Sequence, residues 1–368
     1  MTRLLAAMLL IYWVCSSNLY AGNPERIGQA GATQLLVNPY ARSSGSNGGN
    51  AAFTWGIESA ITNPAGLAHT RKSEVVFAHT RWMNTADVSV NALGISQALG
   101  ERGGVLGLSI VSFGFGEIPI TTIDNPDGGL GTFSPTFLNL GLTYAQTMVS
   151  DRIFIGATLK IIHESIPDVS ATGVAFDGGV QYQSKGKDDR PGNFRLGVAL
   201  RNVGPQMQYR GDGLTFRTAT GGAGSTFDSR ASTVAAAFEL PSVLLVAAAY
   251  HFRFNYNDTT RMAEHMVTPL FSFVSNSFGN DQYILGAEYA FKGMFMLRAS
   301  YAFEQDISDK EESLNAFTGL SLGATFEIPF VRRNALTSHG NSTFGLDYSM
   351  RQTYFFGFTH CIGLRINI

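Results

Sequence analysis

Hydrophobic and polar residues alternate with a period of two along most of the chain after residue 73. In residues 136–148, one parity carries Leu138, Leu140, Leu142 and Tyr144, whereas the other carries small or polar residues. This is the period of side chains on the two faces of a β-strand. Fourteen such segments, separated by Gly, Asn, Asp and Pro, can be counted: 74–81, 87–98, 104–115, 136–148, 152–164, 172–183, 192–202, 231–240, 243–254, 282–291, 293–304, 318–328, 343–351 and 358–368.

Charged residues separate two architectures that share this alternation, a soluble β-sandwich and a transmembrane β-barrel. Five basic and four acidic residues lie on the parity opposite the apolar one, where they would face a lumen: Lys160, Asp177, Arg195, Arg201, Glu288, Arg298, Glu327, Asp347 and Arg365. Charges of both signs can pair across neighbouring strands, as Glu288 and Arg298 could. A tilted strand of about ten residues also has the length that a bilayer requires. We therefore predict an all-β fold, an antiparallel transmembrane β-barrel of about 14 strands.

The lengths of the connections agree with a barrel in an outer membrane. If Glu74 starts on the periplasmic side, long loops such as 116–135, 203–230 and 255–281 fall outside, and short turns such as 99–103 and 241–242 fall inside. Aromatic residues on the apolar parity, among them Tyr144, Phe291 and Phe303, suit the interfacial girdles of such barrels. Residues 268–274 could form an additional strand, so the sequence leaves the count open by one hairpin.

The N-terminal part of the chain has two further regions. Residues 1–21 follow the pattern of a secretory signal peptide, with Arg3, an apolar run from Leu4 to Val14 and Ala21 at the expected cleavage site. After cleavage, Cys361 would be the remaining cysteine, so an intramolecular disulfide is excluded. Residues 22–73 lack a sustained period and precede the barrel, which we assign to 74–368.

Residues 22–73 are predicted to form a plug inside the barrel. Fourteen strands enclose more space than the eight whose own side chains fill the interior. The segment contains Phe53, Trp55, Ile57 and Ile61, which are too apolar for a solvated tail. Its end carries Asn63-Pro64-Ala65, for which a simple turn is the alternative interpretation. Pro64 restricts Asn63 to an extended conformation, which would help this segment to connect the plug to the first strand.

Composition excludes several classes of protein. Charged residues make up 15% of the chain, below the roughly one quarter usual for soluble domains. The net charge of −2 does not fit a nucleic-acid-binding surface. No catalytic constellation is found: His163 precedes Glu164 and Ser165 without an orienting third residue, and Asp124 to Gly129 is better explained as a turn than as a calcium site. The sequence therefore predicts neither an enzyme nor a bound metal or cofactor.

Several short stretches carry a resemblance to a known family. Residues 60–68, with their Asn-Pro-Ala segment, together with 74–82, 121–128, 140–145, 156–164, 173–182 and 202–207, are similar to the PorV/PorQ family, a FadL-related group of Bacteroidetes-like bacteria. The final residues, 361–368, resemble the C-terminal signal of outer-membrane barrels, with Ile368 in place of the usual aromatic residue. The resemblance implies a plugged barrel in the outer membrane of a Gram-negative bacterium, with membrane lipids as neighbours.

Two functions remain open from the sequence. The resemblance implies a type IX secretion-related role, in which secreted proteins with C-terminal signal domains, or other secretion components, bind the outer loops. Tyr354, Phe355 and Phe356 would be aromatic anchors for such a partner. The alternative is a FadL-like channel for hydrophobic or amphiphilic small molecules, in which Gly114 and Gly116 could bend the third strand to open the wall. A purely structural role is also compatible with the sequence.

Overall fold

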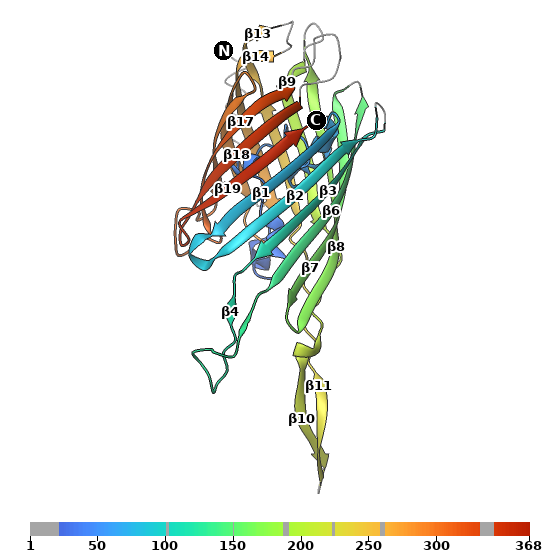
Figure 1. The fold of residues 1–368 in the computed structure, drawn as a ribbon, viewed down its shortest axis with the longest axis vertical. Coiled ribbons are helices and arrows are strands. Elements are labelled where there is room, and N and C mark those ends of the chain that lie inside the picture. Colours follow the sequence, from blue (N-terminus) through green and yellow to red (C-terminus); the bar gives the residue numbers. More distant parts are fainter. Residues whose placement is uncertain are drawn as a thin grey trace.

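The structure, a computed structural model, describes residues 22–100, 103–149, 151–186, 191–222, 225–257, 262–331 and 342–368. These residues form a tilted β-barrel that encloses the N-terminal segment (Figure 1). Among them, no helix is long and apolar enough to cross a membrane. The signal peptide predicted for residues 1–21 lies outside the described residues.

The period of two in the sequence becomes the difference between the two faces of the wall. In β1 (Ser73–Met83), Val75 and Phe77 are exposed on the outer face, whereas Val76 and Ala78 are buried toward the lumen. Large apolar side chains are exposed in the same way on strands around the barrel. A barrel in water would hide this surface, so the exposed band is the surface that contacts lipid.

Fourteen antiparallel strands close the wall. β1 pairs with the last strand, β19, and β12 pairs with both β9 and β14, so the described sheet has no open edge over these ladders. The other strands are β2 (Val88–Ala98), β3 (Val105–Gly114), β6 (Thr136–Val149), β7 (Ile153–Ile166), β8 (Val169–Lys185), β9 (Pro191–Val203), β12 (Val243–Tyr250), continued by β13 (Phe252–Asn257), β14 (Met262–Asn276), β15 (Gln282–Phe291), β16 (Phe295–Glu304), β17 (Phe317–Val331), β18 (Ser342–Thr353) and β19 (Phe358–Asn367).

The predicted strand count is confirmed, but one of the predicted strands is wrong. Residues 231–240 do not cross the membrane: the chain there makes isolated bridges through Phe238 and Glu239, within one long outer connection. The missing strand is β14, inside the segment predicted as the loop 255–281, so 241–242 is not a periplasmic turn. β14 contains residues 268–274, the possible additional strand of the sequence prediction, and Pro269 lies opposite Ala287 in the ladder.

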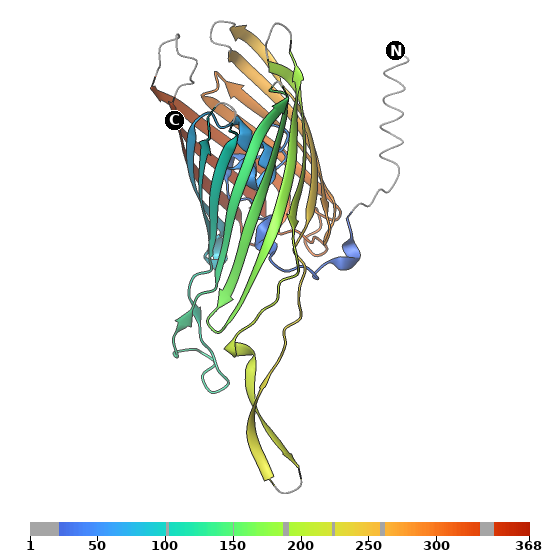
Figure 2. The same ribbon diagram turned by 90° about the vertical axis from the view of Figure 1, so that its right-hand side faces the viewer.

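The plug is built from short helical turns rather than regular elements. These turns are η1 (Pro24–Arg26), η2 (Thr33–Leu36), α2 (Ala41–Ser44), α3 (Ser59–Thr62) and η3 (Pro64–His69). Nearly all residues from 38 to 68 are buried or half-buried. The plug begins where Arg26 pairs with Glu239 at 2.8 Å, and it ends beside the rim where Ser73 hydrogen-bonds Ile368. It therefore runs through the lumen from one rim to the other (Figure 2).

Two extensions project from the rim opposite the C-terminus (Figures 1 and 2). One carries β4 (Ile118–Pro119) and β5 (Thr132–Phe133) between β3 and β6. The longer one, which we call the arm (residues 204–242), carries η5 (Asp212–Leu214), β10 (Thr215–Gly222) and β11 (Ser225–Ser232) between β9 and β12. Long loops mark the outer face of outer-membrane barrels, so we call this the outer rim.

Candidate functional site

The contact between the plug and the wall is closest at Asn63 and Pro64. Gly156 of β7 is paired with Gly179 of β8, so two neighbouring wall positions lack a side chain. A Cβ atom on Gly156 would lie 2.4 Å from the carbonyl group of Pro64, and one on Gly179 would lie 2.1 Å from Asn63 Oδ1. These distances are too short for any side chain, so the paired glycines create the space that the plug occupies.

Asn63 holds this contact through three hydrogen bonds. Its Nδ2 donates to the carbonyl oxygens of Ala51, at 3.1 Å, and Val180, at 3.0 Å, while its Oδ1 accepts from the Ala65 N–H at 3.2 Å. The residue is extended, with φ −148° and ψ 105°, and caps η3, whose first residue is Pro64. Proline suits this position because its missing N–H would have no helical partner. The motif therefore caps a helical turn and attaches the plug to β8.

A buried ionic cluster surrounds Trp55 on the opposite side of the plug. The guanidinium groups of Arg42 and Arg365 lie 3.9 Å and 4.7 Å from the centroid of the indole ring. Arg42 pairs with Glu58 at 2.5 Å, and Arg365 pairs with Asp347 at 3.1 Å. Burial lowers the pKa of Arg42, and the carboxylate of Glu58 opposes this effect. The first pair lies within the plug and the second within the wall, so plug and wall are joined here by the cation–π contact of Arg365 with Trp55.

The cluster continues along the wall through Arg298. This side chain donates to Glu288 at 2.5 Å and to Thr325 at 2.7 Å, and Thr325 in turn donates to Asp347. Arg298 and Thr325 are both buried. Strands β15 to β18 are therefore joined by one network of charged and hydroxyl side chains on the lumen side.

Wall side chains also satisfy backbone carbonyl groups of the plug. Ser321 donates to the carbonyl of Ser44 at 2.6 Å, and Ser272 donates to that of Gly49 at 2.7 Å. Gln181 donates to two plug carbonyls, both at 3.0 Å. An irregular segment has carbonyls that no helix or sheet satisfies, so these polar wall residues make a buried plug without regular structure possible.

A second polar group lies on the other half of the wall. Lys160 of β7 pairs with Asp177 at 2.5 Å and donates to Asn202 Oδ1 at 2.8 Å, while the N–H of Asn202 donates to Asp177 at 2.7 Å. Asn202 has a φ of 59° and sits where the register of β8 and β9 shifts. Its neighbour Arg201 donates to the carbonyl of Leu35 in the plug at 3.3 Å.

The outer end of this half is an apolar seam, formed by Ala32, Leu35, Ile162, Ala171, Ala175, Met207 and Leu240, with Tyr209 and Phe238 beside them. Strand β9 ends at Val203, so beyond this level the arm takes the place of a paired strand and joins β8 by a bridge between Ser170 and Arg210. One polar contact crosses the seam: Glu164 accepts from Gln34 at 2.7 Å and from the Tyr209 hydroxyl. Burial, together with the hydrogen bond to Glu164, raises the pKa of Tyr209.

His69, the last residue of η3, is half-buried at the periplasmic end of the plug. Its Nε2 is 3.0 Å from Gln181 Oε1, and its ring lies 4.1 Å from that of Phe154, between centroids. Burial lowers the pKa of His69 to about 4, and the nearby charge of Arg195 acts in the same direction. The imidazole is therefore neutral at physiological pH.

The nine charged residues predicted to face the lumen all lie on the inward parity. Seven are buried, and Arg195 and Glu327 are half-buried; the Glu327 carboxylate is 3.9 Å from Arg365. Eight of them belong to the two polar groups described above, whereas Arg195 belongs to neither and its charge acts on His69. Sequence reasoning missed Arg42, Glu58 and Glu164, although Glu164 continues the parity of Lys160 and could have been found from it.

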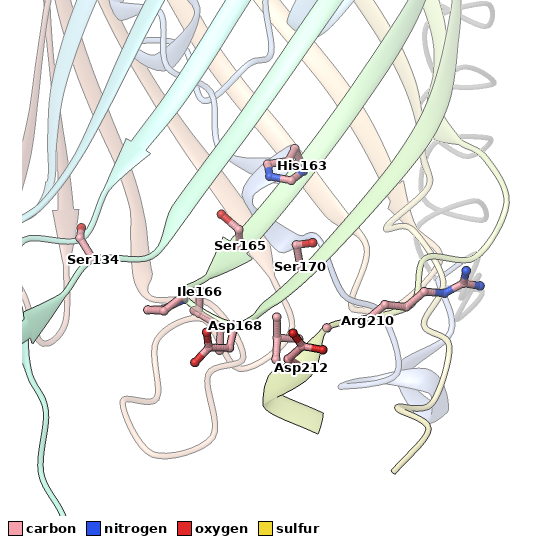
Figure 3. A pocket seen from close by; sticks show the side chains of 11 residues that line it. Ser134, His163, Ser165, Ile166, Asp168, Ser170, Arg210 and Asp212 are labelled. Atoms are coloured by element: carbon pink, nitrogen blue, oxygen red, sulfur yellow. The ribbon is translucent and has the colours of Figure 1, made fainter. Parts of the chain in front are cut away.

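A cavity of about 610 Å³ lies outside the lumen, at the outer rim (Figure 3). It is lined by the β7–β8 turn and the base of the arm; Asp168 and Asp212 lie below Ser165 and Ser170 in Figure 3, and the Arg210 side chain is directed away. His163 Nδ1 is 2.9 Å from Thr172 Oγ1, and both side chains belong to the outward parity. The described residues hold no cluster of three or more His, Cys, Asp or Glu side chains that could bind a metal.

The aromatic loop residues lie at the outer rim between β18 and β19. Phe355 is 59% exposed, with Lys310 Nζ 4.8 Å from its ring centroid, whereas Tyr354 and Phe356 are half-buried. Tyr354 donates to the carbonyl of Ile307 in the neighbouring loop. Only one of the three side chains is therefore free over much of its surface.

The third strand does not bend away from its neighbours. Gly114 pairs with Ser89 of β2 and with Thr136 of β6, and neither ladder shows a register shift. Gly116, with a φ of 68°, lies beyond the end of β3. The expected opening at Gly114 is therefore wrong, and the place where strand pairing ends early is the seam between β8 and the arm.

No protein-family model and no curated protein matches the sequence. Three solved structures are similar in fold: a Pseudomonas aeruginosa FadL homologue (12% identity, 89% of this chain and 98% of that one, TM-score 0.50), the CymD monoaromatic hydrocarbon channel (15%, 90% and 97%, 0.49) and the Pseudomonas putida toluene transporter TodX (12%, 86% and 94%, 0.45). At these identities, the likeness concerns the fold alone. The chain thus has the fold of the FadL-type outer-membrane barrels, a fourteen-stranded wall around an N-terminal plug.

Proposed function

We propose that this barrel carries hydrophobic or amphiphilic small molecules across the outer membrane, along one side of the plug. The observation that carries the proposal is the asymmetry of the contact between plug and wall. Toward β15 to β19 the contact includes polar interactions, the cation–π contact of Arg365 with Trp55 and the hydrogen bond from Ser321 to the carbonyl of Ser44. Toward β7, β8 and the arm, the outer end of the contact is the apolar seam.

The free energy needed to move the plug away from the wall differs between the two sides. Moving the plug away from this side would separate Arg365 from Trp55 and break the hydrogen bond from Ser321 to Ser44, interactions that contribute about 2 kcal/mol and about 1 kcal/mol. Apolar side chains such as Leu35 and Met207 can exchange one apolar neighbour for another at little cost. We propose that the charged residues, Lys160, Asp177, Arg195, Arg201, Glu288, Arg298, Glu327, Asp347 and Arg365, anchor the plug and that the seam is the path.

An apolar passage also agrees with the filled lumen. In the described part of the chain, residues 38–68 of the plug are all buried or half-buried, so the plug fills much of the lumen. A hydrophobic molecule can instead replace the contacts of side chains that already pack against one another. The sequence alternative, a channel for hydrophobic or amphiphilic molecules, is the function that this arrangement supports best.

Filling the seam tests the proposal. Leu35, 5% exposed, belongs to the seam, whereas its neighbour Leu36 is 46% exposed, so Leu35→Trp and Leu36→Trp form a matched pair. In cells that lack the gene, we expect the natural protein and Leu36→Trp to restore uptake of toluene and of a fluorescent fatty acid. We expect Leu35→Trp to reduce that uptake by about tenfold, while surface expression of both variants stays equal. Uptake that does not depend on the gene, or that survives Leu35→Trp, overturns the proposal.

Exposed apolar residues on the outer extensions favour a second function, the binding of secreted proteins with C-terminal signal domains. Ile123 is 99% exposed, Val234 79% and Phe355 59%, all in loops that leave the membrane. Such residues are typical anchors at protein interfaces. In that role Tyr354, Phe355 and Phe356 would contact the cargo in a type IX secretion-related pathway of a Bacteroidetes-like bacterium. Signal-domain proteins that still reach the surface after deletion of the gene would exclude it.

A further inference from the structure

The cavity at the outer rim lies between the barrel wall and the arm (Figure 3). Its volume, about 610 Å³, is within the range of about 300–1,000 Å³ that is usual for small-molecule sites. Ser165 and Ser170, which pair with each other at the end of β7 and β8, line one side. The base of the arm, from Arg210 to Asp212, lines the other side. We call this cavity the rim groove.

Backbone contacts fix the two sides of the rim groove against each other. Ser170 and Arg210 exchange two hydrogen bonds of 2.8 Å, and the Gly213 N–H donates to the carbonyl of Asp168 at 3.1 Å. Gly211 has a φ of 149°, and a Cβ atom there would lie 2.1 Å from the carbonyl oxygen of Asp168. Only glycine permits both this conformation and this approach. The groove therefore has its shape before a ligand binds, which lowers the entropy cost of binding.

The rim groove lies at the edge of the lipid-facing band. Ile161 of β7 and Val174 of β8 lie opposite each other, and both are exposed on the outer face of the wall. The next two outward pairs along these strands are polar, and the second of them, Ser165 with Ser170, lines the groove. Because the apolar band of a barrel matches the hydrocarbon of the membrane, the groove lies at the level of the lipid headgroups.

The side chains of the rim groove suit a ligand with several hydroxyl groups. The hydroxyls of Ser134, Ser165 and Ser170 can each donate and accept a hydrogen bond. The carboxylates of Asp168 and Asp212, both exposed, accept hydrogen bonds. Among the described residues, none of these five side chains has a hydrogen-bond partner, so all of them are available to a ligand. A sugar ring offers neighbouring hydroxyls that can satisfy both kinds of group.

The two carboxylates also decide the charge of the ligand. No described cation forms an ion pair with Asp168 or Asp212. The Arg210 side chain is directed away from the groove and donates to Gln208 at 3.4 Å (Figure 3). A phosphate in the groove would therefore meet two like charges, whereas a sugar hydroxyl can donate to either carboxylate. The chemistry favours an uncharged headgroup.

We propose that the rim groove binds the sugar headgroup of a neutral glycolipid in the outer leaflet of the membrane. The sugar hydroxyls donate to Asp168 and Asp212 and exchange hydrogen bonds with the serines, while the acyl chains lie along Ile161 and Val174. Such a lipid contacts the wall and the arm together and holds the base of the arm at the membrane surface. This role is independent of the proposed transport.

Native mass spectrometry of the full-length mature protein, in a polyoxyethylene detergent without sugar, tests the ligand class. The probes are digalactosyldiacylglycerol, phosphatidylglycerol and phosphatidylethanolamine with the same acyl chains. We expect the glycolipid to bind about tenfold more tightly than either phospholipid, a difference of about 1.4 kcal/mol. Equal affinity for the three lipids, or a preference for either phospholipid, overturns the proposal.

The headgroup alone tests whether the ligand is a lipid. Digalactosylglycerol carries the same sugars without acyl chains and lacks the apolar contact with Ile161 and Val174. Since burial of apolar surface contributes to the affinity for the lipid, we expect it to bind at least about tenfold more weakly than the glycolipid. Equal affinity of the two would identify a free saccharide as the ligand and contradict the assignment to a membrane lipid.

Two double variants with the same change in charge locate the binding. Asp168→Ala with Asp212→Ala alters the rim groove, and Asp124→Ala with Asp127→Ala alters exposed residues of the other outer extension. We expect the groove variant to bind the glycolipid about tenfold more weakly, because it loses charge-assisted hydrogen bonds, and the control to bind it like the natural protein. Both should keep the compact form of the barrel on unheated gels. An unchanged affinity in the groove variant, or an equal loss in both, would overturn the proposal.

Discussion

Gly156 and Gly179 face each other across β7 and β8, and the backbone of Asn63 and Pro64 occupies the space that their missing side chains leave. This pair decides how closely the plug approaches the wall. Neither glycine has a positive φ, so the requirement for glycine there comes from the contact and not from the backbone conformation.

We expect Gly179→Ala to displace the plug, because its Cβ would lie 2.1 Å from Asn63 Oδ1. Overpacking of this kind costs about 1–3 kcal/mol and would open a gap beside η3. Planar-bilayer recordings should show a higher ion conductance than that of the natural protein. Gly178→Ala is the matched control, since its Cβ would meet its nearest atom, in Phe176, at 3.7 Å. Equal conductance of the two variants would contradict the role of the glycine pair.

Asn63→Ala removes two donors to backbone carbonyls and one acceptor for the Ala65 N–H. Since a buried group left without its partner costs about 1–3 kcal/mol, we expect a lower melting temperature in detergent by circular dichroism. Asn63→Asp keeps the acceptor but loses both donors, so it should be destabilised as well. A melting temperature unaltered by Asn63→Ala would show that the plug does not depend on this side chain.

We also predict that Pro64→Gly raises ion leakage through the reconstituted barrel. Glycine at the first position of η3 removes the restriction on φ. It therefore raises the conformational entropy that this segment must lose when it packs in the lumen. Conductance should rise less than in Gly179→Ala, because no clash forces the segment to move. Unchanged conductance would count against Asn63-Pro64-Ala65 as a hinge of the plug.

Arg298→Gln should destabilise the barrel more than the loss of an exposed pair. It leaves Glu288 buried without its cation, which typically costs about 3–5 kcal/mol. Lys292→Gln, which breaks the exposed pair with Glu264 at 3.3 Å, serves as the control and should change the stability much less, because water screens this pair. Urea unfolding in detergent measures both values. Adding Glu288→Gln to Arg298→Gln should restore part of the loss, and a double variant as unstable as the sum of the two would contradict the pairing.

The pKa of His69, about 4 in the folded protein, makes stability depend on pH. An unfolded histidine has a pKa near 6.5, so the unfolded chain binds the proton first and stability falls as pH decreases from about 6.5 to 4. The loss should approach about 3 kcal/mol at pH 4, in thermal melts of the natural protein relative to His69→Gln. Parallel pH profiles of the two proteins would show that the pKa of His69 is the same in the folded and the unfolded protein, which contradicts the prediction.

The sequence alone determined the wall. In segments such as 136–148, side chains that face lipid alternate with side chains that face the lumen. This alternation can be followed one residue at a time along the sequence, so it predicts the strands of the wall. The same alternation placed Glu288 and Arg298 on one face, and their pairing followed from two adjacent strands. Local pattern failed between β9 and β15: residues 231–240 alternate like a strand but belong to the arm, whereas residues 268–274, offered only as a possible additional strand, lie in β14.

Only the tertiary structure decided what fills the barrel and how. The contacts of the plug join residues far apart in the sequence, such as Gln34 with Glu164 and Trp55 with Arg365, and no periodicity encodes them. The sequence also does not show that the amide oxygen of Asn139 lacks a partner, because the residues beside it, Leu35 and Val37, come from another part of the chain. The hydrophobic period of a strand shows which of its side chains face lipid and which face the lumen. An irregular plug has no such period, and its conformation depends on its contacts with the surrounding wall.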